Sequence, residues 1–170
     1  MTTSAANPMP NREPASAAHT LSVPRAIFYA TLAVGLLDAT DGVVFRGVQG
    51  QNPIQVLQYI ASSLLGAGAY SEGLSSAGLG LVLHFAVSAM VATIYILSSR
   101  RIEVLRMRWV TLGLLFGIAV WTVMNLVVLP LSAAAHDSIT TTALLNGVIG
   151  HALFVGLPIS YSARKTEAAR

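Results

Sequence analysis

Four long apolar stretches dominate the pattern of the chain. They cover Ala26–Phe45, Leu74–Leu97, Trp109–Leu131 and Thr141–Ser162. Each is close to the ~20 residues that a helix needs to cross ~30 Å of hydrocarbon. Backbone N–H and C=O groups in lipid must be bonded within their own segment, so such stretches predict helices. The pattern therefore predicts an all-α fold, a four-helix transmembrane bundle.

The composition agrees with a membrane protein. The chain has 170 residues, of which 54% are hydrophobic and 10% are charged, and it has no cysteine. A soluble domain usually carries about 25% charged residues. Hydrolase and nucleotide-binding classes are excluded by the motifs, because the chain lacks a Gly-x-Ser-x-Gly elbow, a phosphate-binding Gly-rich loop and a cysteine nucleophile. The sequence thus favours a protein that is not an enzyme.

Polar segments flank the apolar part and divide the chain into three regions. Residues 1–23 are rich in Ala, Ser, Thr and Pro and predict a disordered cytoplasmic tail. Residues 24–163 form the expected transmembrane domain, and residues 164–170 form a basic cytoplasmic tail. A signal peptide is a poor match for the start of the chain, because its basic, apolar and cleavage regions do not follow in order.

The basic residues predict the orientation. Every Lys and Arg except Arg46 lies in the N-terminal tail, in the loop Arg100–Arg108 or in the C-terminal tail. Four crossings bring these three segments to one side, and the positive-inside rule makes that side cytoplasmic. We therefore expect a multi-pass protein with both termini in the cytoplasm and the lipid bilayer as its partner. Nucleic acid is not an expected partner, since aromatic residues other than Trp109 do not interleave with the arginines.

A short amphipathic helix is predicted between the first two crossings. Asn52 is a suitable N-cap, Pro53 suits the first helical position, and Gly66 is a plausible stop. Between them an apolar stripe recurs at helical spacing, formed by Ile54, Leu57, Ile60, Ala61 and Leu64. The helix is too short to span a bilayer. A surface helix and a re-entrant cap are both open, and the absence of Lys and Arg from its polar face favours the cap.

The candidate site consists of polar residues inside the apolar stretches. They are Asp38, Asp41, His84, Asn125, Asn146 and His151. At 1.5 Å per residue from the basic end of each helix, Asp38 and the two histidines lie about 17–20 Å deep, and the other three lie about 23–24 Å deep. A charge at such a position costs at least ~2.5–3.5 kcal/mol, so it normally faces the bundle interior and has a partner. Two polar layers are therefore expected.

Small residues lie on the same helical faces as these polar groups. The rows are Ser76, Gly80, His84, Ser88 and Ala92; Gly113, Gly117, Trp121 and Asn125; and Gly147 with His151, flanked by Asn146 and Gly150. Small residues let membrane helices approach closely, and Asn or His then bonds across the contact. We expect a buried polar cluster with close walls.

Several roles for the cluster remain open. One is structural, with Asn125 and Asn146 as interhelical hydrogen-bond donors and Arg46 reaching back to pair with Asp41. A second is a proton or cation relay in a small transporter-like or channel-like protein, because a carboxylate beside an imidazole in low dielectric can exchange protons. Such a relay could require a homo-oligomer to form a pathway, and the glycine faces make one plausible.

Two further classes are a cofactor-binding protein and a scaffold. Two histidines at one depth could ligate haem, and a His/Asp set could hold a divalent metal. The sequence specifies neither cofactor, since no compact motif places two ligands on one helical face. A scaffold without chemistry would use its arginine loop, Arg100–Arg108, to bind anionic lipid.

The chain resembles a family of small, uncharacterised bacterial inner-membrane proteins with four predicted transmembrane helices. The segments that carry the resemblance are Gln58–Gly66, Leu79–Phe85, Ser98–Arg101, Met124–Ser132 and His151–Pro158. The resemblance covers most of the chain from Leu21 onward, through motifs that are apolar and moderately specific. It implies a location in the bacterial inner membrane and no established activity.

Overall fold

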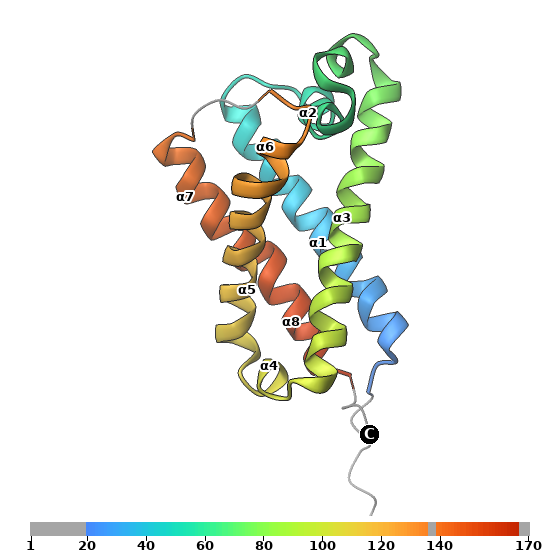
Figure 1. Ribbon diagram of the computed structural model, residues 1–170, viewed down its shortest axis with the longest axis vertical. Coiled ribbons are helices and arrows are strands. Elements are labelled where there is room, and N and C mark those ends of the chain that lie inside the picture. Colours follow the sequence, from blue (N-terminus) through green and yellow to red (C-terminus); the bar gives the residue numbers. More distant parts are fainter. Residues whose placement is uncertain (1–19, 136–138, 167–170) are drawn as a thin grey trace, which may run out of the picture.

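The structure is a computed structural model in which residues 20–135 and 139–166 are described, and these residues are almost entirely helical (Figure 1). The elements are α1 (Val23–Val48), α2 (Pro53–Leu65), η1 (Gly66–Ser71), α3 (Leu74–Arg101), α4 (Val104–Met107), α5 (Trp109–Val123), η2 (Met124–Val128), α6 (Leu129–Leu131), α7 (Thr141–Gly150), η3 (His151–Gly156) and α8 (Leu157–Arg164). The η1 element is a 3-10 helix, and η2 and η3 are π-helical turns. The predicted all-α fold is confirmed.

Four helices in the described residues are long and apolar enough to cross a membrane. They are Val23–Val48, Leu74–Arg101, Trp109–Leu131 and Thr141–Arg164. These four spans coincide with the four predicted stretches and are compatible with a multi-pass integral membrane protein. The second runs a turn beyond the predicted end, to Arg101. Basic residues in a last turn are favourable beside the helix C-terminus, which explains the extension.

Large apolar side chains cover much of the surface of the bundle, and small ones fill its interior. Large apolar side chains point outward, such as Leu36 at 61% and Val82 at 65% exposure, whereas Ala30 and Ala92 are fully buried. Contiguous exposed apolar surface of this kind marks contact with a partner or a membrane. Small residues inside and bulky residues outside suit helices that pack closely in lipid.

The fourth span is the centre of the bundle. Its α8 segment packs against α1, α3 and α5, while its η3 segment packs against α1 and α5. Figure 1 shows the fourth span crossing behind α5, with α3 on the other side of the bundle. Side chains that project from the fourth span toward the interior can therefore meet the other three.

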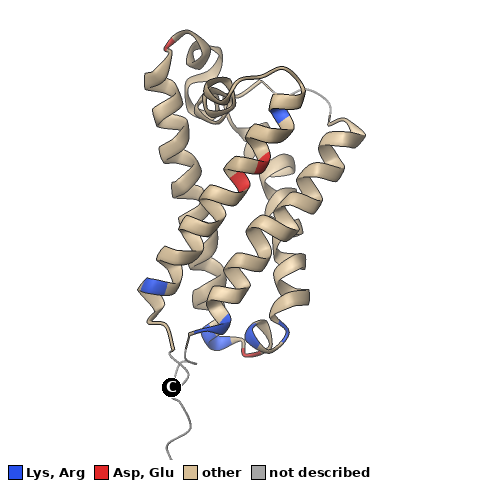
Figure 2. Ribbon diagram, turned by 180° about the vertical axis from the view of Figure 1, so that it is seen from behind, with Lys and Arg blue, Asp and Glu red and all other residues tan. Residues whose placement is uncertain are grey.

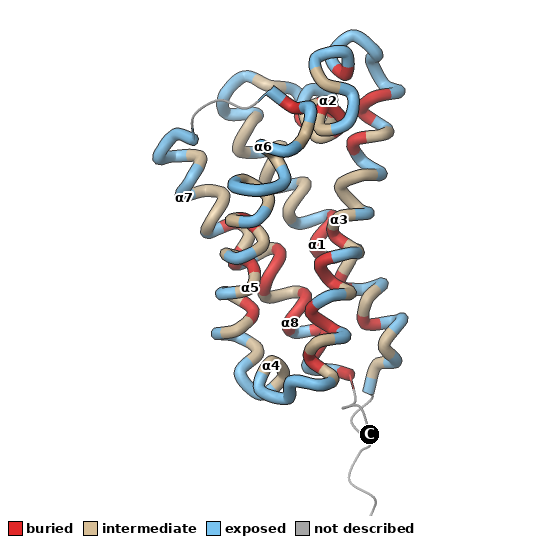
Figure 3. The backbone as a smooth tube through the Cα atoms, in the orientation of Figure 1, coloured by how far each residue is buried: buried red, intermediate tan, exposed pale blue. Residues whose placement is uncertain are grey.

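The core lies in the half of the bundle where α1 begins and α8 ends. It consists of Ala26, Ala30, Val34, Val91, Ala92, Tyr95, Ile96, Val155, Ile159 and Ala163. Figure 3 shows the buried stretches of α1, α3 and α8 facing one another in this half. The third and fourth spans lie close together at Gly113 and Gly156, where an added Cβ on either residue would collide with the partner segment. We call this the packed half.

The charges divide the bundle in the same way. Figure 2 shows Lys and Arg gathered at the end where the packed half lies, and acidic residues within the bundle and at its two ends. We call this the basic end; it carries Arg25, the Arg100–Arg108 loop and Lys165. The opposite end, where α1 finishes, carries Arg46 in the last turn of that helix, and we call it the Arg46 end.

The cap helix α2 begins and ends where the sequence predicts. The Asn52 side chain accepts a hydrogen bond from Gln55 N–H and Gln55 closes a capping box, while Gly66 follows the last residue with a φ of 60°. Figure 1 shows α2 across the Arg46 end of the bundle. It packs against α3, where Gly80 leaves room for the backbone of Leu57.

The face that α2 buries carries both polar and apolar residues. Within the apolar stripe Ala61 is fully buried, whereas Ile54 and Leu64 are exposed. Gln58 and Ser62, which lie away from the stripe, are also buried. Gln58 Nε2 donates to the Gly73 carbonyl at 3.0 Å, which satisfies its buried amide. An amphipathic stripe predicts the buried face of a helix in water, but apolar side chains can face outward where the surroundings are lipid.

The two terminal regions lie largely outside the described residues. The tail predicted over residues 1–23 is described only from Thr20, and the basic tail over 164–170 only as far as Thr166. At their junction, Leu21 N–H donates to the Lys165 carbonyl at 2.8 Å. Arg106 donates to the Thr166 carbonyl at 3.1 Å, so the α4 segment also contacts the end of the fourth span.

Candidate functional site

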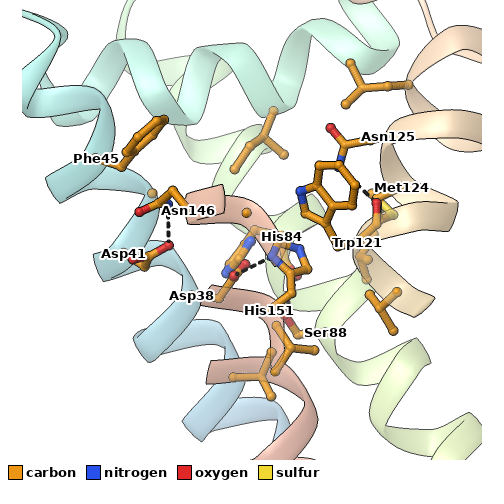
Figure 4. A pocket seen from close by; sticks show the side chains of 18 of the residues that line it. Asp38, Asp41, Phe45, His84, Ser88, Trp121, Met124, Asn125, Asn146 and His151 are labelled. Carbon is orange, nitrogen blue, oxygen red and sulfur yellow. Dashed lines mark hydrogen bonds and ion pairs between the residues drawn. The ribbon is translucent and has the colours of Figure 1, made fainter. Parts of the chain in front are cut away.

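A cavity of about 320 Å³ opens between the four spans in the half of the bundle toward the Arg46 end. All six polar residues singled out from the sequence line it, namely Asp38, Asp41, His84, Asn125, Asn146 and His151. Figure 4 shows them converging from the helices on both sides of the cavity. Each is half-buried. Side chains that are far apart in the chain thus share one interior space.

Asp38 and His151 are neighbours in the layer nearer the basic end. Asp38 Oδ1 lies 3.6 Å from His151 Nδ1, and the two side chains are 20% and 22% exposed. That distance exceeds a hydrogen bond, and His151 Nδ1 is a buried atom without a hydrogen-bond partner. His151 Nδ1 therefore lies beside the Asp38 carboxylate without a hydrogen bond. A protonated His151 would form an ion pair with that carboxylate.

Asp41 and Asn146 form the pair of the second layer. The Asn146 amide Nδ2 donates to Asp41 Oδ2 at 3.0 Å, between residues 105 positions apart in the chain. Gly150 lies against the same carboxylate, where an added Cβ would be 2.7 Å from Asp41 Oδ2. Two residues of the fourth span therefore position the Asp41 side chain: Asn146 donates a hydrogen bond to it, and Gly150 packs against it.

His84 has a different environment from His151. Its Nε2 lies 3.0 Å from the Gly35 carbonyl oxygen. A carbonyl oxygen can only accept, so Nε2 must carry the hydrogen of this bond. His84 thereby links α3 to α1, which is the structural role that the sequence left open for it. The two histidines therefore differ. His84 makes a hydrogen bond between helices, whereas His151 has a ring nitrogen without a hydrogen-bond partner.

Two polar residues make contacts other than those expected. Asn125 Nδ2 donates to the Trp121 carbonyl at 2.9 Å, within its own helix instead of across the bundle. Arg46 was expected to pair with Asp41, but its guanidinium lies over the Tyr59 ring, 4.7 Å from the centroid. The expected pair is not among the ion pairs of the described residues. A cation is favourable over an aromatic face, and α2 supplies that face.

Two π-helical turns lie at the level of the cavity. In η2, Leu129 N–H bonds to Met124 O, and in η3, Leu157 N–H bonds to Ala152 O. Each turn is followed by a proline, Pro130 or Pro158. Proline lacks an N–H and its ring crowds the carbonyl of the preceding turn, so the helix widens there.

Glycines allow the cavity to form beside close helix contacts. A Cβ on Gly117 would collide with the His151 carbonyl, and one on Gly147 would collide with the Trp121 indole. These glycines belong to the small-residue rows found in the sequence. They bring α5 against η3 at His151, which fixes the backbone that carries the unpaired imidazole.

A second hollow of about 280 Å³ lies toward the Arg46 end. It shares Phe45, Arg46, Tyr59, Trp121 and Asn125 with the main cavity and extends to Gln49 and Thr140. Phe45 and Tyr59 lie where the two spaces join, which we call the neck, and no pattern in the sequence singled them out. Tyr59 follows the buried Gln58 on α2. Its place beside the cavity could not be predicted without knowing where α2 lies on the bundle.

The comparisons add no assignment. No protein-family model, no curated protein and no solved structure matches the chain. The resemblance to small bacterial inner-membrane proteins therefore stays a prediction. Among the described residues, no three His, Asp or Glu side chains lie close enough together to hold a metal ion. The cavity is therefore the feature of this molecule that bears on its function.

Proposed function

We propose that the protein is a small transporter-like or channel-like membrane protein whose Asp38–His151 pair binds a proton or small cation. The observation that supports this proposal best is the convergence of six intramembrane polar residues on one cavity. Ionisable residues in spans are costly and commonly mark ion or proton pathways. A protein that needed only interhelical bonds would have no use for a space of about 320 Å³ between them.

His151 is the proton acceptor in this proposal, and Asp38 is the group that stabilises the proton. At 3.6 Å the Asp38 carboxylate can attract an imidazolium without requiring that the imidazole be charged. Asp41 is held by Asn146, and it adds negative potential beside the same space. His84 positions α1 against α3 through the Gly35 carbonyl and does not carry the proton.

Access in this proposal comes from the Arg46 end. The second hollow extends the cavity in that direction, while the apolar core closes the packed half. The positive-inside rule makes the basic end cytoplasmic, so the cavity faces the outer side of the bacterial inner membrane. Passage to the other side requires the packed half to open. The π-helical turns η2 and η3, at the level of the cavity, are suitable hinges.

Proton flux into liposomes tests this proposal. The purified protein is reconstituted with a pH-sensitive dye inside the vesicles, and a potassium gradient with valinomycin imposes a potential. We expect a protein-dependent flux that Asp38→Asn lowers by at least about tenfold, equivalent to about 1.4 kcal/mol. Glu72→Gln is the matched control, since Glu72 is an exposed carboxylate near the Arg46 end. Flux that is equal in Asp38→Asn and wild type would contradict the proposal.

A further inference from the structure

The cavity is larger than a proton or a bare ion needs. Its volume of about 320 Å³ falls within the ~300–1,000 Å³ of small-molecule sites. A single water molecule occupies only ~30 Å³ of liquid. An ion alone would leave most of the space to water, beside walls that are largely apolar. The volume therefore suits an organic solute.

The walls are of two kinds. Apolar side chains surround most of the space, among them Val34, Leu83, Val87, Val120, Met124 and Val155. The negative side chains come from α1 alone, where Asp38 and Asp41 follow one another by one turn. Figure 4 shows Asp41 and the Trp121 indole on opposite sides of the cavity. A solute that fits must have an apolar body and a positive end directed at α1.

We infer that the cavity binds a small organic cation, a protonated amine carried on an apolar or aromatic body. This inference rests on the proposed function and names the class of its solute. An ammonium group has three donors, and each carboxylate has about four acceptor positions. Asn146 occupies one position on Asp41, so both carboxylates can accept further bonds. An ammonium between them also offsets their mutual repulsion.

Aromatic side chains add to this recognition at the neck. Phe45, Tyr59 and Trp121 line both the cavity and the second hollow. A cation is stabilised over an aromatic face, and the Arg46 guanidinium already occupies the Tyr59 ring at 4.7 Å. Phe45 and Trp121 remain for the solute. Arg46 at this neck disfavours a second positive group on the solute, so we expect a monocation.

The amine and the proton compete for Asp38. When an ammonium group binds this carboxylate, the imidazolium of His151 loses its counter-ion, and its proton leaves to water at the Arg46 end. The imidazolium N–H bond breaks and an O–H bond forms on the water that takes the proton, and the charge in the cavity is conserved because one cation replaces another. Binding of the amine is therefore coupled to release of a proton, as an exchanger requires.

Trp121 fluorescence tests the inference. The chain has two tryptophans, and Trp109 lies at the basic end against Tyr161. A Trp109→Phe variant leaves Trp121 as the reporter inside the cavity. The probes are phenethylamine, its neutral analogue phenethyl alcohol and the anion hydrocinnamate. We expect saturable binding of the amine at least about tenfold tighter than of either analogue, a difference of about 1.4 kcal/mol.

The variants sharpen this test. In the Trp109→Phe background, Asp38→Asn and Asp41→Asn should each weaken amine binding by about tenfold or more, while Glu72→Gln should not change it. Equal binding of the amine and the alcohol, preference for the anion, or no saturable response would each overturn the inference. The comparison of probes needs no cavity variant, so a variant that misfolds does not affect it.

The two proposals can fail separately. Proton flux that depends on Asp38, together with no amine binding, would overturn the organic cation and retain the proton site. Amine binding that is tight in wild type, together with proton flux that is equal in Asp38→Asn, would retain the solute class and overturn the proton role. Release of a proton on amine binding, measured in weakly buffered solution, supports both together.

Discussion

The two halves of the bundle use the same four helices in opposite ways. In the packed half, alanine, valine and isoleucine fill the interior, and glycines at positions 113 and 156 bring two backbones into contact. In the half toward the Arg46 end, the spans separate around a cavity lined by aspartate, histidine and asparagine. Close packing stabilises a membrane bundle. The difference indicates that stability is concentrated in one half and leaves the other free to hold polar groups.

Adding a methyl group at the close helix contact of the packed half should have the largest effect on stability. In Gly156→Ala the added Cβ collides with the Gly113 carbonyl, which belongs to a backbone that cannot give way. We expect a loss of about 2–3 kcal/mol in the free energy of unfolding. Thermal unfolding in detergent, followed by size-exclusion chromatography, measures it. Gly78→Ala is the control, because nothing lies within 4 Å of a Cβ there. Equal stability of the two variants would contradict the conclusion that close packing in this half stabilises the bundle.

The two histidines provide the next test, within the cavity half. His151→Gln removes the imidazole beside Asp38 and should lower proton flux by at least about tenfold. In His84→Gln the new amide can still donate to the Gly35 carbonyl, so flux should remain within about twofold of wild type. Both variants are assayed in the same liposomes. Equal losses of flux would show that the two histidines have one role.

The two asparagines provide a smaller effect on stability. Asn146→Leu removes the donor to Asp41 across two spans and should cost about 1 kcal/mol, within the range for such bonds in membranes. Asn125→Leu removes only a bond to the Trp121 carbonyl in its own helix and should cost less than about 0.5 kcal/mol. Chemical unfolding in mixed micelles measures both. The reverse order would place the interhelical bond at Asn125.

The smallest predicted effect is a gain. Gly42 lines the cavity, and nothing lies within 4 Å of a Cβ built on it. Gly42→Ala should therefore raise the free energy of unfolding by up to about 0.5 kcal/mol through helix propensity. The same substitution thus has opposite signs at Gly156 and at Gly42. A loss above about 1 kcal/mol at Gly42 would mean that the cavity half is as closely packed as the other.

The sequence was sufficient for the spans and for the two polar layers. Apolar length alone located the four helices, because the bilayer permits few other backbone structures. Counting along each helix placed Asp38 near the level of His151 and Asp41 near that of Asn146, and these are the two pairs observed. Because the rise per residue of a helix is regular, the depth of a residue can be calculated without knowing which helices are in contact.

The rotation of each helix about its axis and the local distortions of the helices could not be predicted from the sequence in the same way. The burial of Gln58 and Ser62 on α2 was not predicted, because in lipid an apolar stripe does not define the inside of the bundle. The π-helical turns were not predicted, although Pro130 and Pro158 are their cause. The Arg46 contact depended on the position of Tyr59 across the bundle, which no spacing along the chain specifies.

Accessibility to water tests the central claim most directly, namely that one half of the bundle encloses a polar cavity that opens at the Arg46 end. The chain has no cysteine, so single cysteines can be introduced without a background. Two adjacent pairs separate cavity from lipid. Asn125 and Leu83 line the cavity, while their neighbours Leu126 and Val82 are 62% and 65% exposed on the apolar surface.

A charged, membrane-impermeant thiol reagent is applied to oriented vesicles from each side. The account predicts that Asn125→Cys and Leu83→Cys react from the Arg46 side alone, whereas Leu126→Cys and Val82→Cys react from neither side because lipid covers them. Reaction of the lipid-facing pair, or none at Asn125→Cys and Leu83→Cys from the Arg46 side, would contradict it.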